Sequence, residues 1–144
     1  MLIEIPGDPQ SDSRPRAAKL GNFIKIYDSK AAEKKLTKTL IMCQTDQADS
    51  KEISEAKSFG VYFYFYFEPP KSWSKKKQHA AIHGDIPHTC KPDIDNLVKF
   101  YLDCMNKIIF NDDSQVIHLS AQKFYADESK TVIKIYAENA YVCG

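Results

Sequence analysis

The chain has 144 residues, of which 43% are hydrophobic and 12% aromatic, which is enough core material for one domain and argues against disorder. The formal net charge of +1 excludes a strongly basic protein, so a polyanion would have to be bound through local basic clusters. No apolar stretch has the roughly 20 residues of a membrane helix, and residues 1–6 lack the pattern of a signal peptide. We therefore expect residues 1–144 to form a single domain of a soluble, cytoplasmic protein.

The amino-terminal part of the chain predicts two short strands separated by a loop. Residues 2–5 and residues 22–27 alternate in the manner of strands. The stretch 8–21 between them is rich in Pro, Ser, Asp and Arg, a composition that predicts a loop.

A helix is predicted next, from about residue 30 to residue 43, with Ser29 as its cap. Its apolar face would carry Ala32, Leu36, Leu40 and Cys43. The polar residues 44–58 fit either a continued helix around 51–57 or a loop.

The strongest strand pattern lies at residues 61–67, where phenylalanine and tyrosine alternate. Val61 and the phenylalanines share one face, and Tyr62, Tyr64 and Tyr66 share the other. We favour packing of the tyrosine face under helices, with a surface for stacking on nucleic-acid bases as the alternative.

The carboxyl-terminal half predicts one more helix and two strands. After a long loop at 71–90, a helix from about 95 to 108 would bury Leu97, Val98, Tyr101, Leu102, Met105 and Ile109. A turn at 110–114 precedes strands at 116–124 and 131–137, which we expect to form a hairpin. The whole order predicts an α+β domain, with a mixed, largely antiparallel sheet packed with two main helices.

Two acidic segments carry the candidate chemistry. Asp93 and Asp95 begin the predicted helix, and Asp112 and Asp113 lie in the turn that follows it, while Lys99 lies one helical turn after Asp95. Crowded carboxylates need a cation, and oxygen ligands select hard ions such as Mg²⁺ or Mn²⁺, which can promote hydrolysis of phosphodiester bonds. The residues alone also allow a plain helix cap, a plain turn and a surface Asp95–Lys99 ion pair.

Basic and thiol residues add further hypotheses. Contacts to DNA phosphates are expected from Arg14, Arg16, Lys75, Lys76, Lys77 and Lys91. A zinc site is the weaker alternative for His79, His83, His88 and Cys90. The cysteines have no C-x-x-C spacing, and we expect free thiols at Cys43, Cys90, Cys104 and Cys143.

Segments 91–99 (KPDIDNLVK) and 111–116 (NDDSQV), with Asp103 between them, resemble the RusA-type Holliday junction resolvases. The resemblance is strong from about 89 to 136 and weaker from 2 to 30. It implies a homodimeric, Mg²⁺-dependent endonuclease that nicks two opposed strands of a four-way DNA junction. Members are typically bacterial and often encoded by prophages, which implies the cytoplasm of a bacterial or phage-infected cell.

The resemblance also implies the roles of individual residues. The family's essential acidic positions fall on Asp93, Asp95 and Asp113, its catalytic lysine falls on Lys99, and Asp112 is a further candidate ligand. Two other functions remain open: a nuclease acting on flaps or other branched DNA, and a non-catalytic DNA-binding module in which Trp73 stacks on bases.

Overall fold

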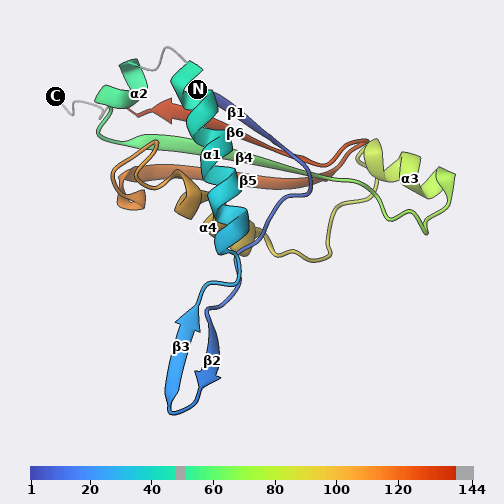
Figure 1. Cartoon of the computed structure of the whole chain (residues 1–144). Coiled ribbons are helices and arrows are strands. Elements are labelled where there is room, and N and C mark those ends of the chain that lie inside the picture. The colour runs from blue at the N-terminus through green and yellow to red at the C-terminus, as the bar shows by residue number, and fades with distance from the viewer. Residues whose placement is uncertain (48–50, 139–144) are drawn as a thin grey trace.

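The computed structural model describes residues 1–47 and 51–138, so Cys143 lies outside the described residues. Within them the chain is a mixed α+β domain built on one four-stranded sheet (Figure 1). In spatial order the strands are β1 (Leu2–Pro6), β6 (Lys130–Ala137), β4 (Phe59–Phe67) and β5 (Val116–Tyr125). No helix in these ranges is long and apolar enough to cross a membrane.

The sheet is mixed, and the predicted pairing of its last two strands is wrong. β6 is antiparallel to both β1 and β4, whereas β5 runs parallel to β4 at the sheet edge. The hairpin expected between β5 and β6 therefore does not form, because β4 lies between them. The physical reason is burial: β4 has apolar side chains along its length and takes a central place, while β5 leaves Ile117 and Leu119 exposed and can be an edge strand.

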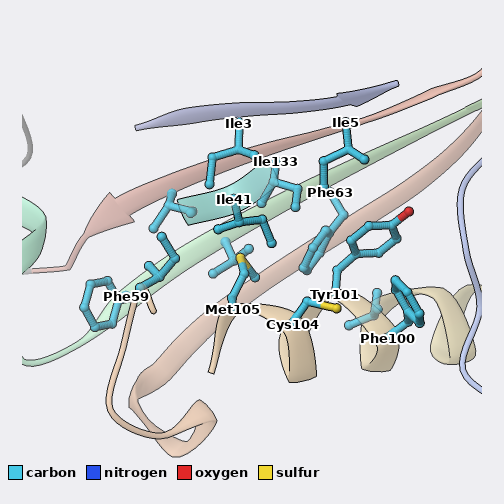
Figure 2. Packing of buried hydrophobic residues seen from close by; sticks show 14 of the residues in the cluster. Ile3, Ile5, Ile41, Phe59, Phe63, Phe100, Tyr101, Cys104, Met105 and Ile133 are labelled. Atoms are coloured by element: carbon cyan, nitrogen blue, oxygen red, sulfur yellow. The ribbon is translucent and has the colours of Figure 1, made fainter. Parts of the chain in front are cut away.

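Two long helices cover one face of the sheet. The helix α4 (Ile94–Met105) buries Leu97, Val98, Phe100, Tyr101, Cys104 and Met105, so the predicted apolar stripe is largely confirmed. Figure 2 shows Tyr101, Cys104 and Met105 facing Ile3, Phe63 and Ile133 of the sheet.

The helix α1 (Ala31–Gln47) is present, but its predicted buried face is only partly correct, since Leu40 packs against the core and the other predicted residues do not. Thr37 and Ile41 point into the core, while Leu36 is 64% exposed and Cys43 is exposed. The face is rotated because α1 packs against both α4 and β1. This rotation directs Lys34, one turn before Thr37, toward aspartates of other segments.

The segment predicted as a loop at 8–21 contains a strand. β2 (Arg16–Leu20) pairs with β3 (Phe23–Tyr27) in a separate antiparallel hairpin. Its turn includes Gly21, whose φ of 59° suits glycine. The hairpin projects away from the rest of the molecule (Figure 1), and it leaves Leu20, Phe23, Ile24 and Ile26 exposed.

Shorter helices occupy two further segments. α2 (Lys51–Glu55) shows that helix is the correct alternative for this part of the 44–58 stretch. The long loop predicted at 71–90 contains α3 (Lys75–Ile82), which is a correction. The physical cause is a cap: the Ser74 hydroxyl accepts a hydrogen bond from the Lys77 backbone N–H.

The tyrosine face of β4 is not covered by α1 or α4, so the prediction that it packs under helices is wrong. Both helices contribute to the core on the phenylalanine face. The tyrosines are half-buried among sheet neighbours instead, with Tyr62 against His118 and Tyr136, and Tyr64 and Tyr66 against Phe124. Base stacking by this face stays a prediction.

Candidate active site

The first turn of α4 presents two carboxylates. Asp93 occupies the N-cap position, yet its side chain makes no capping hydrogen bond, so it is available for another role. Its carboxylate instead lies 2.6 Å from the ammonium of Lys91. Asp95 is exposed in the first turn, where the helix N-terminus favours negative charge.

The second acidic segment is a structured turn in which the two aspartates differ. Asp112 caps the short 3₁₀ helix η1 (Asp113–Gln115) by accepting hydrogen bonds from the Ser114 backbone and hydroxyl. The hydroxyl bond lowers the pKa of Asp112 below its ordinary value. The Gln115 side-chain oxygen accepts from the Asp112 N–H at 3.3 Å, which completes a capping box, and also from the Asn111 N–H at 2.8 Å. Asp112 therefore stabilises the turn, and Asp113 is left to face the neighbouring cavity.

A cavity of about 490 Å³ brings the acidic segments together. Its polar lining consists of Asp95, Lys99, Asp103 and Asp113, and its apolar lining comes from α4 and β5. Asp95 also borders a second cavity of about 520 Å³, shared with Asp93 and Lys123. The carboxylate of Asp95 thus connects the environment of Asp93 with that of Asp113.

The chemistry of this donor set fits a hard divalent cation. In the described ranges, no three His, Cys, Asp or Glu side chains are grouped closely enough to hold a metal by themselves. Mg²⁺ is commonly held by one or two carboxylates together with waters and substrate phosphates, so the pair Asp95 and Asp113 meets this requirement. The donors are oxygen atoms, which Mg²⁺ and Mn²⁺ prefer to the nitrogen and sulfur donors favoured by Zn²⁺.

The four residues of the zinc alternative do not form one metal-binding cluster in the described part of the chain. His79 lies on α3 and His83 caps its C-terminus, whereas His88 lies 3.7 Å from the Cys90 sulfur. Burial, with the charge of Lys123 as a further cause, lowers the pKa of His88. Cys90 also contacts the Tyr125 hydroxyl, and it is a free thiol, as are Cys43 and Cys104.

Sequence reasoning missed two residues that organise the site. The Lys123 ammonium donates hydrogen bonds to the carbonyls of Cys90 at 2.7 Å and Pro92 at 2.9 Å, and so fixes the segment that leads into Asp93. Its position among the inward-facing residues of β5 was the available signal. Asp12, in the stretch treated as a loop, lies 3.6 Å from the Lys99 ammonium.

Lys34 is the centre of a charge network next to the Asp12–Lys99 ion pair. Its ammonium lies 2.9 Å from Asp28, 3.1 Å from Asp12 and 3.5 Å from Asp103. Burial by itself would lower the pKa of Lys34, but the hydrogen bonds to Asp28 and Asp12 outweigh it and raise the pKa above its ordinary value. The network links the start of the β2–β3 hairpin, its end, and α4.

The predicted DNA-contacting residues lie on three segments. Arg14 and Arg16 are exposed at the start of the hairpin, and the three lysines 75–77 are exposed on α3. Lys77 lies 4.0 Å from the centre of the Trp73 ring, so this tryptophan already has a cation over it. Lys91, the remaining candidate, is paired with Asp93 at the site itself.

Comparisons with known proteins match most of the chain. A sequence model of the family described as "Endodeoxyribonuclease RusA" matches residues 6–136. An uncharacterized protein, YqaN of Bacillus subtilis (strain 168), is 32% identical over 131 residues, which cover 91% of this chain and 92% of that protein. The crossover junction endodeoxyribonuclease rusA of Lactococcus phage r1t is 24% identical over 134 residues, covering 92% of this chain and 93% of the phage protein.

Proposed function

Since this chain belongs to the endodeoxyribonuclease RusA family, we propose that it is a Mg²⁺-dependent, structure-selective endonuclease that resolves four-way DNA junctions. The observation that carries the proposal is the shared cavity, in which Asp95 of α4 and Asp113 of the later turn meet Lys99. Segments distant in sequence thus supply two oxygen donors and a cation to one open space. Such a combination suits a phosphodiester substrate.

The residues divide the chemistry among themselves. We assign Asp93, Asp95 and Asp113 as the residues that would hold the metal, together with waters and phosphate oxygens of the substrate; the metal would supply Lewis-acid activation of the scissile phosphate and of the attacking water. Lys99, whose side chain is 64% exposed, offers its ammonium to a phosphate oxygen or to the attacking water. Asp112 keeps the 111–115 turn in shape, and this capping role makes it a poor candidate for a ligand.

Binding of the DNA is assigned to the exposed basic residues. Arg14 and Arg16 on the hairpin, Lys75 to Lys77 on α3, and Lys91 beside Asp93 would contact phosphates. With a net charge of only +1, affinity depends on these local clusters and should fall steeply as salt rises.

The active form is proposed to be a homodimer, because two equivalent sites match the approximate two-fold symmetry of a four-way junction. Exposed apolar side chains support an association: Ile117 on the edge strand β5, and Phe23, Ile24 and Ile26 on the hairpin. An isolated two-stranded hairpin is also marginally stable in water, so contact with a partner or with DNA would stabilise it.

The test is a cleavage assay on a synthetic four-way junction, with and without Mg²⁺, with each strand labelled in turn. We expect paired, symmetric nicks that require the metal. Nicks confined to flap or fork substrates would assign the same chemistry to another branched DNA. Junction binding without any nick, at permissive pH and low salt, would leave only a DNA-binding module and would refute the proposal.

A further inference from the structure

Asp12 is a nearly buried carboxylate held rigidly beside α4. Its side chain is 6% exposed. Its backbone N–H donates to the Asn96 carbonyl of α4 at 2.9 Å, and its Oδ1 accepts from the Ser13 N–H at 2.9 Å. Nearby, the Gln10 N–H donates to the hydroxyl of Tyr101, which also bonds to Thr131 in the core. The segment carrying Asp12 is therefore fixed to the same helix that carries Lys99.

The two oxygens of Asp12 serve two different lysines. Oδ1 lies 3.1 Å from the Lys34 ammonium, and Oδ2 lies 3.6 Å from the Lys99 ammonium. We infer that Asp12 is the positioning residue for Lys99, holding its ammonium at the edge of the cavity that Asp95 and Asp113 border. The inference rests on the proposed function, since it concerns how Lys99 meets the phosphate or the water.

A positioning role follows from the flexibility of lysine. Lys99 has a four-carbon side chain that is 64% exposed, and such a side chain loses much rotamer freedom when held in one geometry. In the described part of the chain, the ion pair with Asp12 is the one salt bridge that Lys99 makes. An anchor that is itself rigid reduces the entropy cost of placing the ammonium in the transition state.

Metal binding and plain structural support explain Asp12 less well. A carboxylate that is nearly buried and faces two ammonium groups has little room for a metal ion. Replacing it by asparagine leaves Lys34 with Asp28 and Asp103, so no buried charge loses all its partners. The backbone hydrogen bond to Asn96 is also kept, so the main loss is the ion pair with Lys99.

The experiment is a double-mutant cycle measured on the four-way junction at saturating Mg²⁺. Asp12→Asn should lower kcat by about ten- to a hundredfold, as losses of orienting partners commonly do, with KM changed by less than about twofold. In a Lys99→Met background the same change should have no further effect on kcat. Asp8→Asn, an exposed aspartate of the same segment, is the matched control and should behave like the unmodified protein.

The outcomes separate this inference from the proposed function. An unchanged kcat in Asp12→Asn, or an equal loss in the unmodified and the Lys99→Met backgrounds, overturns the positioning role. If the unmodified protein makes no metal-dependent nicks, or Lys99→Met leaves kcat unchanged, the proposed function or its site is what has failed. If circular dichroism shows that Asp12→Asn is unfolded, Asp12→Glu is measured instead; its displaced carboxylate should also lower kcat, and an unchanged kcat overturns the inference.

Discussion

Two sets of aspartates lie against α4, and they differ in what neutralises them. Asp12 and Asp28 meet the ammonium of Lys34, which the chain itself supplies. Asp95 and Asp113 border an open cavity, where Lys99 is the one cation among the lining residues of the described chain. The first arrangement ties separate segments of the chain together, and the second leaves oxygen donors for a cation from outside. Charge balance therefore separates Asp12 and Asp28, which are paired with a lysine of the chain, from Asp95 and Asp113 at the open cavity.

The largest effect should come from removing one of the two carboxylates, Asp95 and Asp113, that border the open cavity. Asp113→Asn should reduce junction cleavage by about a thousandfold or more, since metal-ion catalysis contributes several kcal/mol of transition-state stabilisation. Stability should not fall, because a repelling charge is removed. Single-turnover cleavage and thermal unfolding measure the two effects.

Asp127→Asn is the matched control, because this aspartate is exposed in the β5–β6 connection. Retained cleavage in Asp113→Asn, with the control also active, would remove Asp113 from the site.

Removing the Lys34 ammonium, which pairs with Asp12 and Asp28, should lower the stability of the protein. Lys34→Met leaves Asp12, Asp28 and Asp103 without their shared partner and should lower the free energy of unfolding by about 2–3 kcal/mol, less than for a fully buried pair. Lys34 is 14% exposed and Asp28 is 40% exposed, which explains the reduced value. Urea unfolding gives the number.

Lys38→Met, an exposed lysine one turn along α1, provides the comparison and should unfold like the unmodified protein. Equal stability of the two variants would show that the Lys34 network contributes nothing to the fold.

In the second acidic segment, the neighbours Asp112 and Asp113 differ in role, since Asp112 caps η1 and Asp113 borders the cavity. Asp112→Ala removes the cap of η1 and should lower the temperature of thermal unfolding. Asp112→Ser keeps a capping hydroxyl and should restore most of that stability. If the serine variant folds well but loses cleavage as fully as Asp113→Asn, Asp112 is a metal ligand and not only a cap.

The candidate site residues could be named from the sequence more readily than the arrangement around them. The resemblance of two motifs to one family singled out Asp93, Asp95 and Asp113 as candidates, and the helical period identified most of the buried face of α4. These signals are local, so a sequence carries them directly. The role of Asp112 as a cap also follows a local rule, since Asp112 and Gln115 match the capping-box spacing.

The non-local features could not be predicted in the same way. Nothing in the alternation of β5 and β6 shows that β4 lies between them, and the composition of 8–21 concealed β2. The inward face of α1 contains Lys34, whose partners come from distant segments, so a search for an apolar stripe found only Leu40 of that face. For the same reason Asp12 was missed: its function depends on which lysines the fold brings to it.

The smallest expected effect is the pH dependence of the stability that the Lys34 ion pairs contribute. The hydrogen bond from Lys34, and then that from the Lys30 backbone, lower the pKa of Asp28 below its ordinary value of 3.8. A lowered folded-state pKa means that this contribution to stability is present above pH 3.8 and is lost as the pH falls through the folded-state value. The raised pKa of Lys34 keeps its contribution intact up to the ordinary value of 10.5. The stability difference between the unmodified protein and Lys34→Met should therefore be constant from about pH 5 to pH 9 and shrink below about pH 4. A difference that stays constant down to pH 2 would show that the Asp28 carboxylate is not paired with Lys34 in solution.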